Sequence, residues 1–183
     1  MAIRFLDVVF SVLGLAFGLP LMLLLYIMLR SESSSPIYCQ ERVGKHKKKF
    51  TLYKFRTMRL GAKSLPTHEA EVSDITTIGI TLRRTKLDEI PQLWNVLKGD
   101  MSLVGPRPGL FNHQQLITAR EELGLYNIKP GITGLSQIKK IDMSTPNLLA
   151  KTDAEMMRSM SVKNYFYYVL LTIIGSRSGA ARD

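Results

Sequence analysis

The first thirty residues hold the longest apolar stretch of the chain. No residue from 8 to 29 is charged, and only Ser11 and Tyr26 carry hydroxyl groups there. Because about 20 apolar residues suffice to cross the roughly 30 Å hydrocarbon layer of a bilayer, the stretch predicts a membrane-embedded segment. A cleaved signal peptide is the less favoured interpretation, since its apolar region usually has only about 7–15 residues and precedes a small-residue cleavage site.

Pro20 lies in the middle of this apolar stretch. Proline removes a backbone hydrogen bond and clashes with the preceding turn, so the helix should bend there. Two architectures are open: a kinked helix that crosses the bilayer, or a segment that enters, turns at Pro20 and leaves on the same face. Arg4 before the stretch and Arg30 after it favour the second, with both ends cytoplasmic. We therefore expect a re-entrant membrane helix over residues 1–30, broken at Pro20.

Alternating apolar and polar positions predict a small β-hairpin after the membrane segment. Residues 37–43 and 50–58 have the composition of strands, and Gly44 lies in the turn region between them. Residues 60–76, rich in Gly, Ser, Pro and Thr, are expected to form a loop. These elements begin a second segment, residues 31–183, which we expect to fold as one domain at the cytoplasmic face.

Helical spacing returns in the second half of the chain. Apolar residues recur at Ile90, Leu93 and Leu97, which predicts a helix. Pro91 suits its first turn, and Gly99 suits the position just after its end.

Two further helices are predicted, a polar one over residues 110–123 and an apolar one from Asp153 to Ile174. The last apolar run is too short to span a bilayer, so a core helix is the first interpretation and a helix lying in the membrane interface is the second. The expected fold class is therefore mixed α and β, mostly α. It combines an N-terminal re-entrant membrane helix, a small β-hairpin and interfacial amphipathic helices around one domain.

Charge narrows the choice of partner. The 183 residues include 25 Lys or Arg and 15 Asp or Glu, which gives a formal net charge of +10. Residues 42–68 contain many basic and no acidic side chains, which is typical of a solvated basic surface or of a surface that binds anionic lipid. Nucleic acid is disfavoured as a partner because no recognised binding motif accompanies the run. A single cysteine excludes a disulfide-built scaffold.

Asp88 and Glu89 stand just before Pro91, at the start of a predicted helix. Free N–H groups and the positive end of the helix dipole stabilise carboxylates there, so ordinary capping is the plain interpretation. Both side chains can also reach one site outside the helix end, where an ionised carboxylate serves as a nucleophile or a Mg²⁺ ligand. Arg83 and Lys86, just upstream, would draw an anionic substrate to the same place.

Arg107 is enclosed by Pro106 and Pro108. The second proline forces Arg107 toward an extended conformation, and a stiff turn of this kind suits an arginine that presents its planar fork to a phosphate. A simple turn is the alternative. Other chemistries lack their motifs, since the sequence has no HExxH, Walker loop, dinucleotide fingerprint or nucleophile elbow.

Four runs of the sequence form a common pattern: 54–58 (KFRTM), 87–102 (LDEIPQLWNVLKGDMS), 104–108 (VGPRP) and 130–137 (PGITGLSQ). Together they resemble the bacterial sugar transferase family, the monotopic phosphoglycosyl transferases. The resemblance covers nearly the whole chain, and its central run is long and specific. At this length the chain is similar to the small members, which are little more than the catalytic domain.

The resemblance implies a reaction at the cytoplasmic face of the bacterial inner membrane. A sugar 1-phosphate, expected to carry an N-acetylated amino sugar, passes from a UDP-sugar to undecaprenyl phosphate, and UMP is released. The resemblance implies Mg²⁺ as cofactor and a covalent phosphosugar on Asp88, with Glu89 as its partner. The two carboxylates are the candidate metal ligands, and Glu89 is expected either to bind Mg²⁺ or to handle a proton. It also implies phosphate or membrane-site contacts for Lys54, Arg83 and Arg107.

Two positions depart from the family pattern. Leu19 precedes Pro20 where members often have serine, and Lys140 lies where members often have an arginine that contacts phosphate. We expect Lys140 to take that role. Two rival hypotheses remain: a non-enzymatic, membrane-anchored basic module that binds anionic lipid or nucleic acid, and a soluble enzyme with a simple N-terminal anchor.

Overall fold

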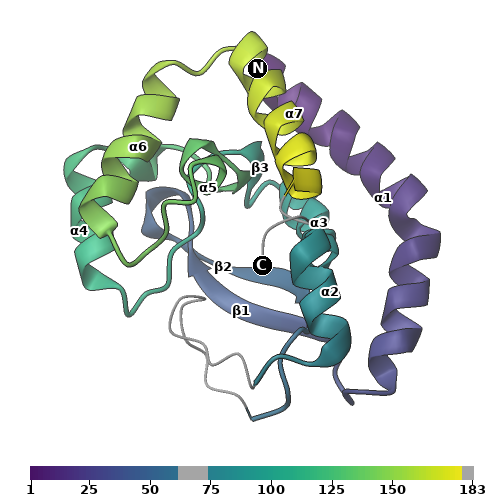
Figure 1. Ribbon diagram of the computed structural model, residues 1–183. Helices are drawn as coiled ribbons and strands as arrows, with labels where there is room; N and C mark the ends of the chain where they lie inside the picture. The colour runs from purple at the N-terminus through teal and green to yellow at the C-terminus, as the bar shows by residue number, and fades with distance from the viewer. Residues whose placement is uncertain (62–73, 179–183) are drawn as a thin grey trace.

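Helices dominate the computed structural model, which describes residues 1–61 and 74–178. The mixed, mostly helical fold class is confirmed (Figure 1). The helices and strands in chain order are α1 (Ala2–Arg30), β1 (Ile37–Val43), β2 (Lys49–Phe55), α2 (Thr77–Thr85), α3 (Gln92–Lys98), β3 (Ser102–Val104), α4 (Gln114–Glu122), β4 (Gly131–Thr133), α5 (Leu135–Ile138), α6 (Pro146–Arg158) and α7 (Val162–Ser178).

Helix α1 contains the predicted membrane segment and stays helical through Pro20. In the described part of the chain it is the one helix that is long and apolar enough to cross a membrane. Many of its apolar side chains face outwards, and Phe17 is 82% exposed. Figure 1 shows α1 at the outer edge of the molecule, changing direction between its two ends. The re-entrant path through a membrane stays a prediction.

Both ends of α1 are attached to the same body. Near its start, Asp7 Oδ1 accepts hydrogen bonds from the hydroxyl groups of Ser102 and Tyr165, at 3.0 Å each, and from the backbone N–H of Leu103 at 2.9 Å. Near its end, Leu29 is buried in an apolar cluster with residues of β2 and α2. The helix therefore lies along the domain over most of its length.

Strands β1 and β2 form the expected antiparallel hairpin, with Val43 opposite Lys49 at the turn. The second strand ends at Phe55 rather than at residue 58, because the chain then pairs with the segment that leads into α2. The backbone N–H of Thr76 donates to the carbonyl of Thr57 at 3.0 Å. Residues 62–73 of the predicted loop lie outside the described residues.

Three elements differ from the sequence-based expectations. Helix α2 follows an unrecognised start signal, in which the Thr76 hydroxyl accepts a hydrogen bond from the backbone N–H of Gly79. Helix α4 is shorter than the predicted 110–123. The helix expected from Asp153 to Ile174 is two helices, α6 and α7, because the Ser159 hydroxyl bonds back to carbonyls of α6 and ends it. The predicted helix around Leu93 is confirmed as α3.

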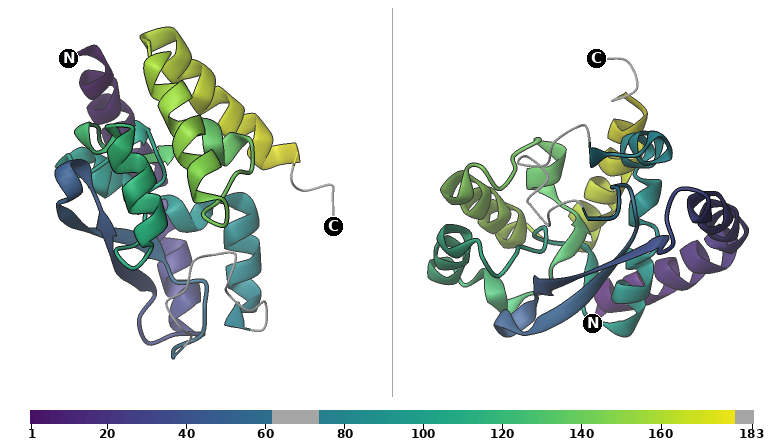
Figure 2. Two further views of the ribbon diagram at one scale, coloured as in Figure 1. Left: turned by 90° about the vertical axis from the view of Figure 1, so that its left-hand side faces the viewer. Right: turned by 90° about the horizontal axis from the view of Figure 1, so that it is seen from below.

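A two-stranded parallel sheet joins residues 102–104 and 131–133, two segments that the sequence did not indicate as partners. Strand β3 pairs with β4, and Gly105, just after β3, packs against Gly131, the first residue of β4. A Cβ atom on Gly131 would lie 2.0 Å from the backbone nitrogen of Gly105, so the close approach requires glycine. Figure 2 shows the β-hairpin and the helices α6 and α7 on different sides of the molecule.

Candidate active site

Asp88 and Glu89 lie in a tight turn between α2 and α3. Lys86 adopts the left-handed conformation, with φ of 57°, and this ends α2. A single 3₁₀ turn over Leu87–Glu89 then leads to Pro91, which precedes α3. The carboxylate pair therefore stands one turn ahead of the helix. Asp88 is only 8% exposed, so it is a buried group rather than a solvated cap.

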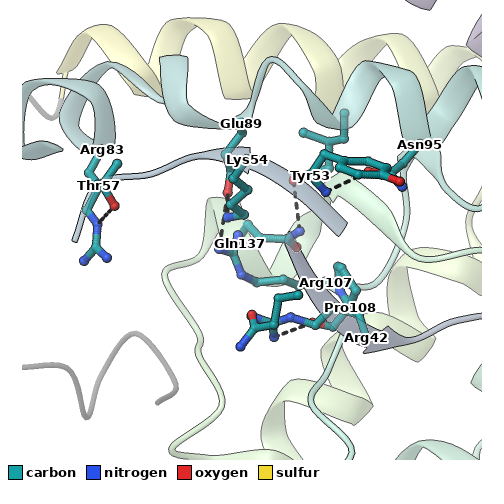
Figure 3. Close-up of polar contacts among 12 residues, drawn as sticks. Arg42, Tyr53, Lys54, Thr57, Arg83, Glu89, Asn95, Arg107, Pro108 and Gln137 are labelled. Atoms are coloured by element: carbon teal, nitrogen blue, oxygen red, sulfur yellow. Dashed lines mark hydrogen bonds and ion pairs between the residues drawn. The ribbon is translucent and has the colours of Figure 1, made fainter. Parts of the chain in front are cut away.

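Glu89 is held by two cations that arrive from different parts of the fold. Its Oε1 accepts from Lys54 Nζ at 2.8 Å and from Arg107 Nη2 at 3.3 Å (Figure 3). Burial raises the pKa of Glu89, but the charges of Lys54 and Arg107 outweigh it and bring the pKa down to about 2. Burial also lowers the pKa of Lys54 below its usual value. Glu89 is therefore a carboxylate at every physiological pH.

Asp88 has the opposite electrostatic balance. Burial raises its pKa to about 6, the neighbouring Glu89 charge adds to the rise, and Lys54 and Arg107 only partly offset it. The sequence pattern indicated a carboxylate stabilised by a helix terminus, and it did not reveal that Asp88 is buried. At neutral pH most Asp88 side chains are still ionised, in a weakly solvated and hence reactive carboxylate.

Asn95 fixes the strand that carries Lys54 against the helix that follows Glu89. Its side-chain Oδ1 accepts from the Tyr53 backbone N–H at 3.1 Å, and its Nδ2 donates to the Thr51 carbonyl at 2.7 Å. Asn95 is fully buried. This role of Asn95 could not be predicted from the sequence, because nothing in the pattern of α3 reveals a partner more than forty residues upstream.

The Pro-Arg-Pro turn is held by two further arginines. Arg120 Nη1 donates to the carbonyl of Arg107 at 2.8 Å, and Arg42 Nη1 donates to the carbonyl of Pro108 at 3.2 Å. Arg120 is itself paired with buried Asp153 at 2.7 Å. The stiff presentation of Arg107 thus comes from tertiary contacts as well as from prolines. These contacts join residues 13 to 66 positions apart, so the sequence pattern could not indicate them.

The other predicted phosphate-binding residues lie outside this cluster. Arg83, on α2, donates from Nε to the Thr57 hydroxyl at 2.8 Å, and Figure 3 places that pair to one side of Glu89 and Lys54. Burial lowers the pKa of Arg83, and the nearby negative charge of Asp88 partly offsets this effect. Lys140 is exposed on the turn after α5 and does not line the depression described next.

A depression of about 230 Å³, which includes space open to solvent, lies beside Glu89. Its lining includes Leu52, Gly131, Ile132 and Pro108, together with the polar residues Arg42, Lys54, Glu89, Gln92 and Arg107. Three cations therefore surround one carboxylate at its wall. Such an arrangement attracts an anion.

Comparison with known proteins identifies the family of the chain. A family model described as bacterial sugar transferase matches residues 1–177. The chain belongs to this family. The expected family is thus confirmed, and the run that contains Asp88 and Glu89 lies within the matched residues.

Several curated relatives support the assignment. Over 108 residues the chain is 48% identical to a putative undecaprenyl-phosphate N-acetylgalactosaminyl 1-phosphate transferase of Bacillus subtilis. This match covers 57% of the chain and 60% of the relative. It is 39% identical to an undecaprenyl-phosphate galactose phosphotransferase of Salmonella typhimurium, over 74% of the chain and 32% of the relative. It is 40% identical to a UDP-glucose:undecaprenyl-phosphate glucose-1-phosphate transferase of Caulobacter vibrioides, over 74% of the chain and 53% of the relative. The matches therefore span at most 60% of the length of these relatives.

The carboxylate pair has the chemistry of a site for Mg²⁺ brought with a substrate. Among the described residues no group of three or more His, Cys, Asp or Glu side chains is placed to hold a metal ion. Mg²⁺ commonly binds through one or two carboxylates together with substrate phosphates, and it keeps several waters. Glu89 Oε1 accepts hydrogen bonds from Lys54 and Arg107. The second oxygen of Glu89 and the carboxylate of Asp88 are therefore the carboxylate oxygens of this pair that can bind the ion. These two residues fit the expected cofactor.

Proposed function

We propose that the protein transfers a sugar 1-phosphate from a UDP-sugar to undecaprenyl phosphate and releases UMP. One observation carries the proposal: a buried carboxylate, Asp88, stands beside a second carboxylate that Lys54 and Arg107 hold ionised. Burial makes the first a better nucleophile, and the cations attract the phosphates of the donor. The family and the names of the relatives agree with this chemistry.

In the first step Asp88 attacks the phosphorus that carries the sugar. One carboxylate oxygen forms a bond to phosphorus, while the bond from phosphorus to the bridging oxygen of the diphosphate breaks. UMP leaves with that oxygen and with the electron pair of the broken bond. The product is an acyl phosphate between Asp88 and the sugar. Arg107 and Lys54 offset the negative charge that builds on the phosphoryl oxygens.

In the second step a phosphate oxygen of undecaprenyl phosphate attacks the same phosphorus. The bond between phosphorus and the Asp88 carboxylate breaks, and the carboxylate returns to its starting form. A proton on the lipid phosphate, where one is present, passes to solvent. The new linkage is a diphosphate between the lipid and the sugar. Asp88 and Glu89 would hold Mg²⁺, which supplies positive charge against donor phosphates when bound.

The membrane is the source of the acceptor, and α1 is suited to reach it. Its long apolar surface is exposed, and apolar side chains are also exposed on neighbouring helices, including Ile80, Trp94 and Leu170. Both ends of α1 contact the same domain, which supports a segment that enters and leaves the bilayer at one face. We propose that this is the cytoplasmic face, because basic residues such as those that follow Arg30 favour that side of a membrane. A water-soluble nucleotide sugar can reach the site there.

The sugar is proposed to be an N-acetylated amino sugar, as in the name of the Bacillus subtilis relative. A panel of UDP-sugars, each supplied with undecaprenyl phosphate and Mg²⁺, tests the function by release of UMP. The proposal expects release with at least one donor and the fastest release with UDP-N-acetylhexosamines. Faster turnover of UDP-glucose or UDP-galactose would correct the sugar. Absence of UMP with every donor would favour the non-enzymatic anion-binding module.

A further inference from the structure

Two side-chain donors at the depression have no hydrogen-bond partner in the described part of the chain. They are Nε of Arg42 and Nε2 of Gln92. Both residues line the depression next to Glu89, and Gln92 is only 3% exposed. Buried polar groups in proteins are nearly always hydrogen-bonded, because an unsatisfied buried donor is unfavourable. The pair therefore points to a ligand that accepts hydrogen bonds.

The charges around the depression define that ligand as an anion. Arg42, Lys54 and Arg107 contribute three positive charges to its wall, and Glu89 contributes one negative charge. Burial and the nearby charge of Arg107 lower the pKa of Arg42 to about 10, which shows that its positive charge is poorly compensated. A phosphate group would accept from both free donors and balance the excess charge.

The orientation of Arg42 is set before any ligand arrives. One terminal nitrogen donates to the Pro108 carbonyl at 3.2 Å, and the other donates to the side chain of Gln40. These two bonds fix the plane of the guanidinium, and the buried Nε–H is left without a partner. A donor held in this way loses little side-chain entropy when it binds.

The position of Arg42 selects which phosphate the two residues bind. In Figure 3 Arg42 and Pro108 lie on one side of Glu89, and Arg83 lies on the other. Arg83 follows Leu82, which packs with the C-terminal part of the apolar helix α1. The Arg83 side is therefore next to the membrane segment, where a lipid phosphate would arrive. Arg42 belongs to the hairpin and bonds to the Pro-Arg-Pro turn, on the opposite side of Glu89 from Arg83, while Gln92 begins α3, whose other side chains pack against α1.

We infer that Arg42 and Gln92 form a subsite for the phosphate group that remains on the nucleotide and leaves as part of UMP. This rests on the proposed function. The subsite holds the leaving group while Asp88 reacts at the neighbouring phosphorus. Arg42 and Gln92 act as binding residues for the donor, with no role in recognition of the lipid.

The test measures UMP binding by titration calorimetry and, separately, steady-state kinetics with both substrates. Gln92→Met keeps the side-chain size and removes the donor. Arg42→Lys keeps the charge and removes Nε. Gln115→Met, an exposed glutamine on α4, is the matched control. A hydrogen bond to a charged group makes roughly a tenfold or larger difference in affinity. We therefore expect each subsite variant to bind UMP at least tenfold more weakly and to raise KM for the UDP-sugar, with KM for undecaprenyl phosphate unchanged.

The outcomes separate the subsite from the function itself. Wild-type UMP affinity retained in both subsite variants would overturn the inference, and so would a raised KM for undecaprenyl phosphate with UMP binding intact. Failure of the wild-type protein to bind UMP at all would count against the proposed function. Thermal melts exclude unfolding as the cause of lost binding. If Gln92→Met is unfolded, Gln92→Glu replaces it in the test. This variant keeps the side-chain size but adds a negative charge, so it must weaken UMP binding.

Discussion

The pKa values of two adjacent buried carboxylates are shifted in opposite directions. Glu89 is compensated by Lys54 and Arg107 at hydrogen-bonding distance, so its pKa falls to about 2. Asp88 has no such partner in the described chain, and burial raises its pKa to about 6. In the proposed mechanism this difference gives the two carboxylates separate roles: Glu89 positions the cations that would bind phosphate, and Asp88 is the nucleophile.

The pH dependence of the first half-reaction follows from the raised pKa of Asp88. Only the ionised carboxylate attacks phosphorus, so the rate of UMP release from donor alone should fall about tenfold per pH unit below about pH 6. Glu89, with its pKa of about 2, adds no second step above pH 4. A rate that stays constant down to pH 4.5 in rapid-quench experiments would contradict this assignment.

Opposite stability effects are expected at the two carboxylates. The pKa of Asp88 is about 6 in the folded protein, above the usual value of 3.8. The protonated carboxyl therefore contributes its full stabilisation below about pH 4, and that contribution is lost as pH rises through 6. Asp88→Asn should therefore stabilise the protein at pH 8, by up to about 3 kcal/mol. Glu89→Gln should destabilise it, because two cations lose their partner. Thermal melts at pH 8 and pH 4.5 measure both; destabilisation by Asp88→Asn at pH 8 would be the contrary result.

At the scale of elements, the site depends on pairings between segments far apart in the chain. The hairpin, the α3 helix and its glycine end signal could be predicted from local patterns, because strand alternation and helix periodicity are properties of neighbouring residues. The pairing of β3 with β4 could not, since three-residue strands carry almost no periodic signal. The bonds from Asn95 to the hairpin and from Arg120 to Arg107 were equally invisible, although they position Lys54 and Arg107.

Gly131→Ala tests the role of the small parallel sheet. The new Cβ atom would lie 2.0 Å from the Gly105 backbone nitrogen, so the two segments must separate and displace the turn that carries Arg107. We expect a loss of about 1–3 kcal/mol in the free energy of unfolding and a fall in kcat. Gly109→Ala is the matched control, because its Cβ would meet only ordinary contacts, the nearest at 3.5 Å. Equal activity in the two variants would contradict this role.

In the whole molecule, the long apolar helix α1 is attached to the domain that carries the site through contacts at both of its ends. Near its start, Arg4 donates to the carbonyls of Val96 and Leu97 at the end of α3, at 2.6 and 2.9 Å. Near its end, Leu25 and Leu29 are buried against the hairpin and α2. The membrane segment itself was evident from composition. Its attachment along the domain was not, because a hydropathy pattern reveals which residues avoid water and not what they contact.

The attachment at both ends predicts that the chain before and after α1 lies on the same face of the membrane. Cys39, exposed on β1, reports the position after the helix. Ala2→Cys in a Cys39→Ser background reports the position before it. Both should react with an impermeant maleimide in inside-out vesicles and resist it in right-side-out vesicles. A residue 2 cysteine that reacts only in right-side-out vesicles would show a helix that spans the bilayer.

Covalent catalysis by Asp88 is the central claim, and donor-only turnover tests it most directly. The enzyme is mixed with its UDP-sugar and Mg²⁺, without lipid acceptor, and quenched rapidly for UMP assay and peptide mass analysis. The account predicts one equivalent of UMP per active site and a sugar-phosphate mass increase on the peptide that contains Asp88, with both absent in Asp88→Asn. UMP release only after addition of undecaprenyl phosphate, with no modified peptide at any time, would contradict it and indicate direct transfer between the two substrates.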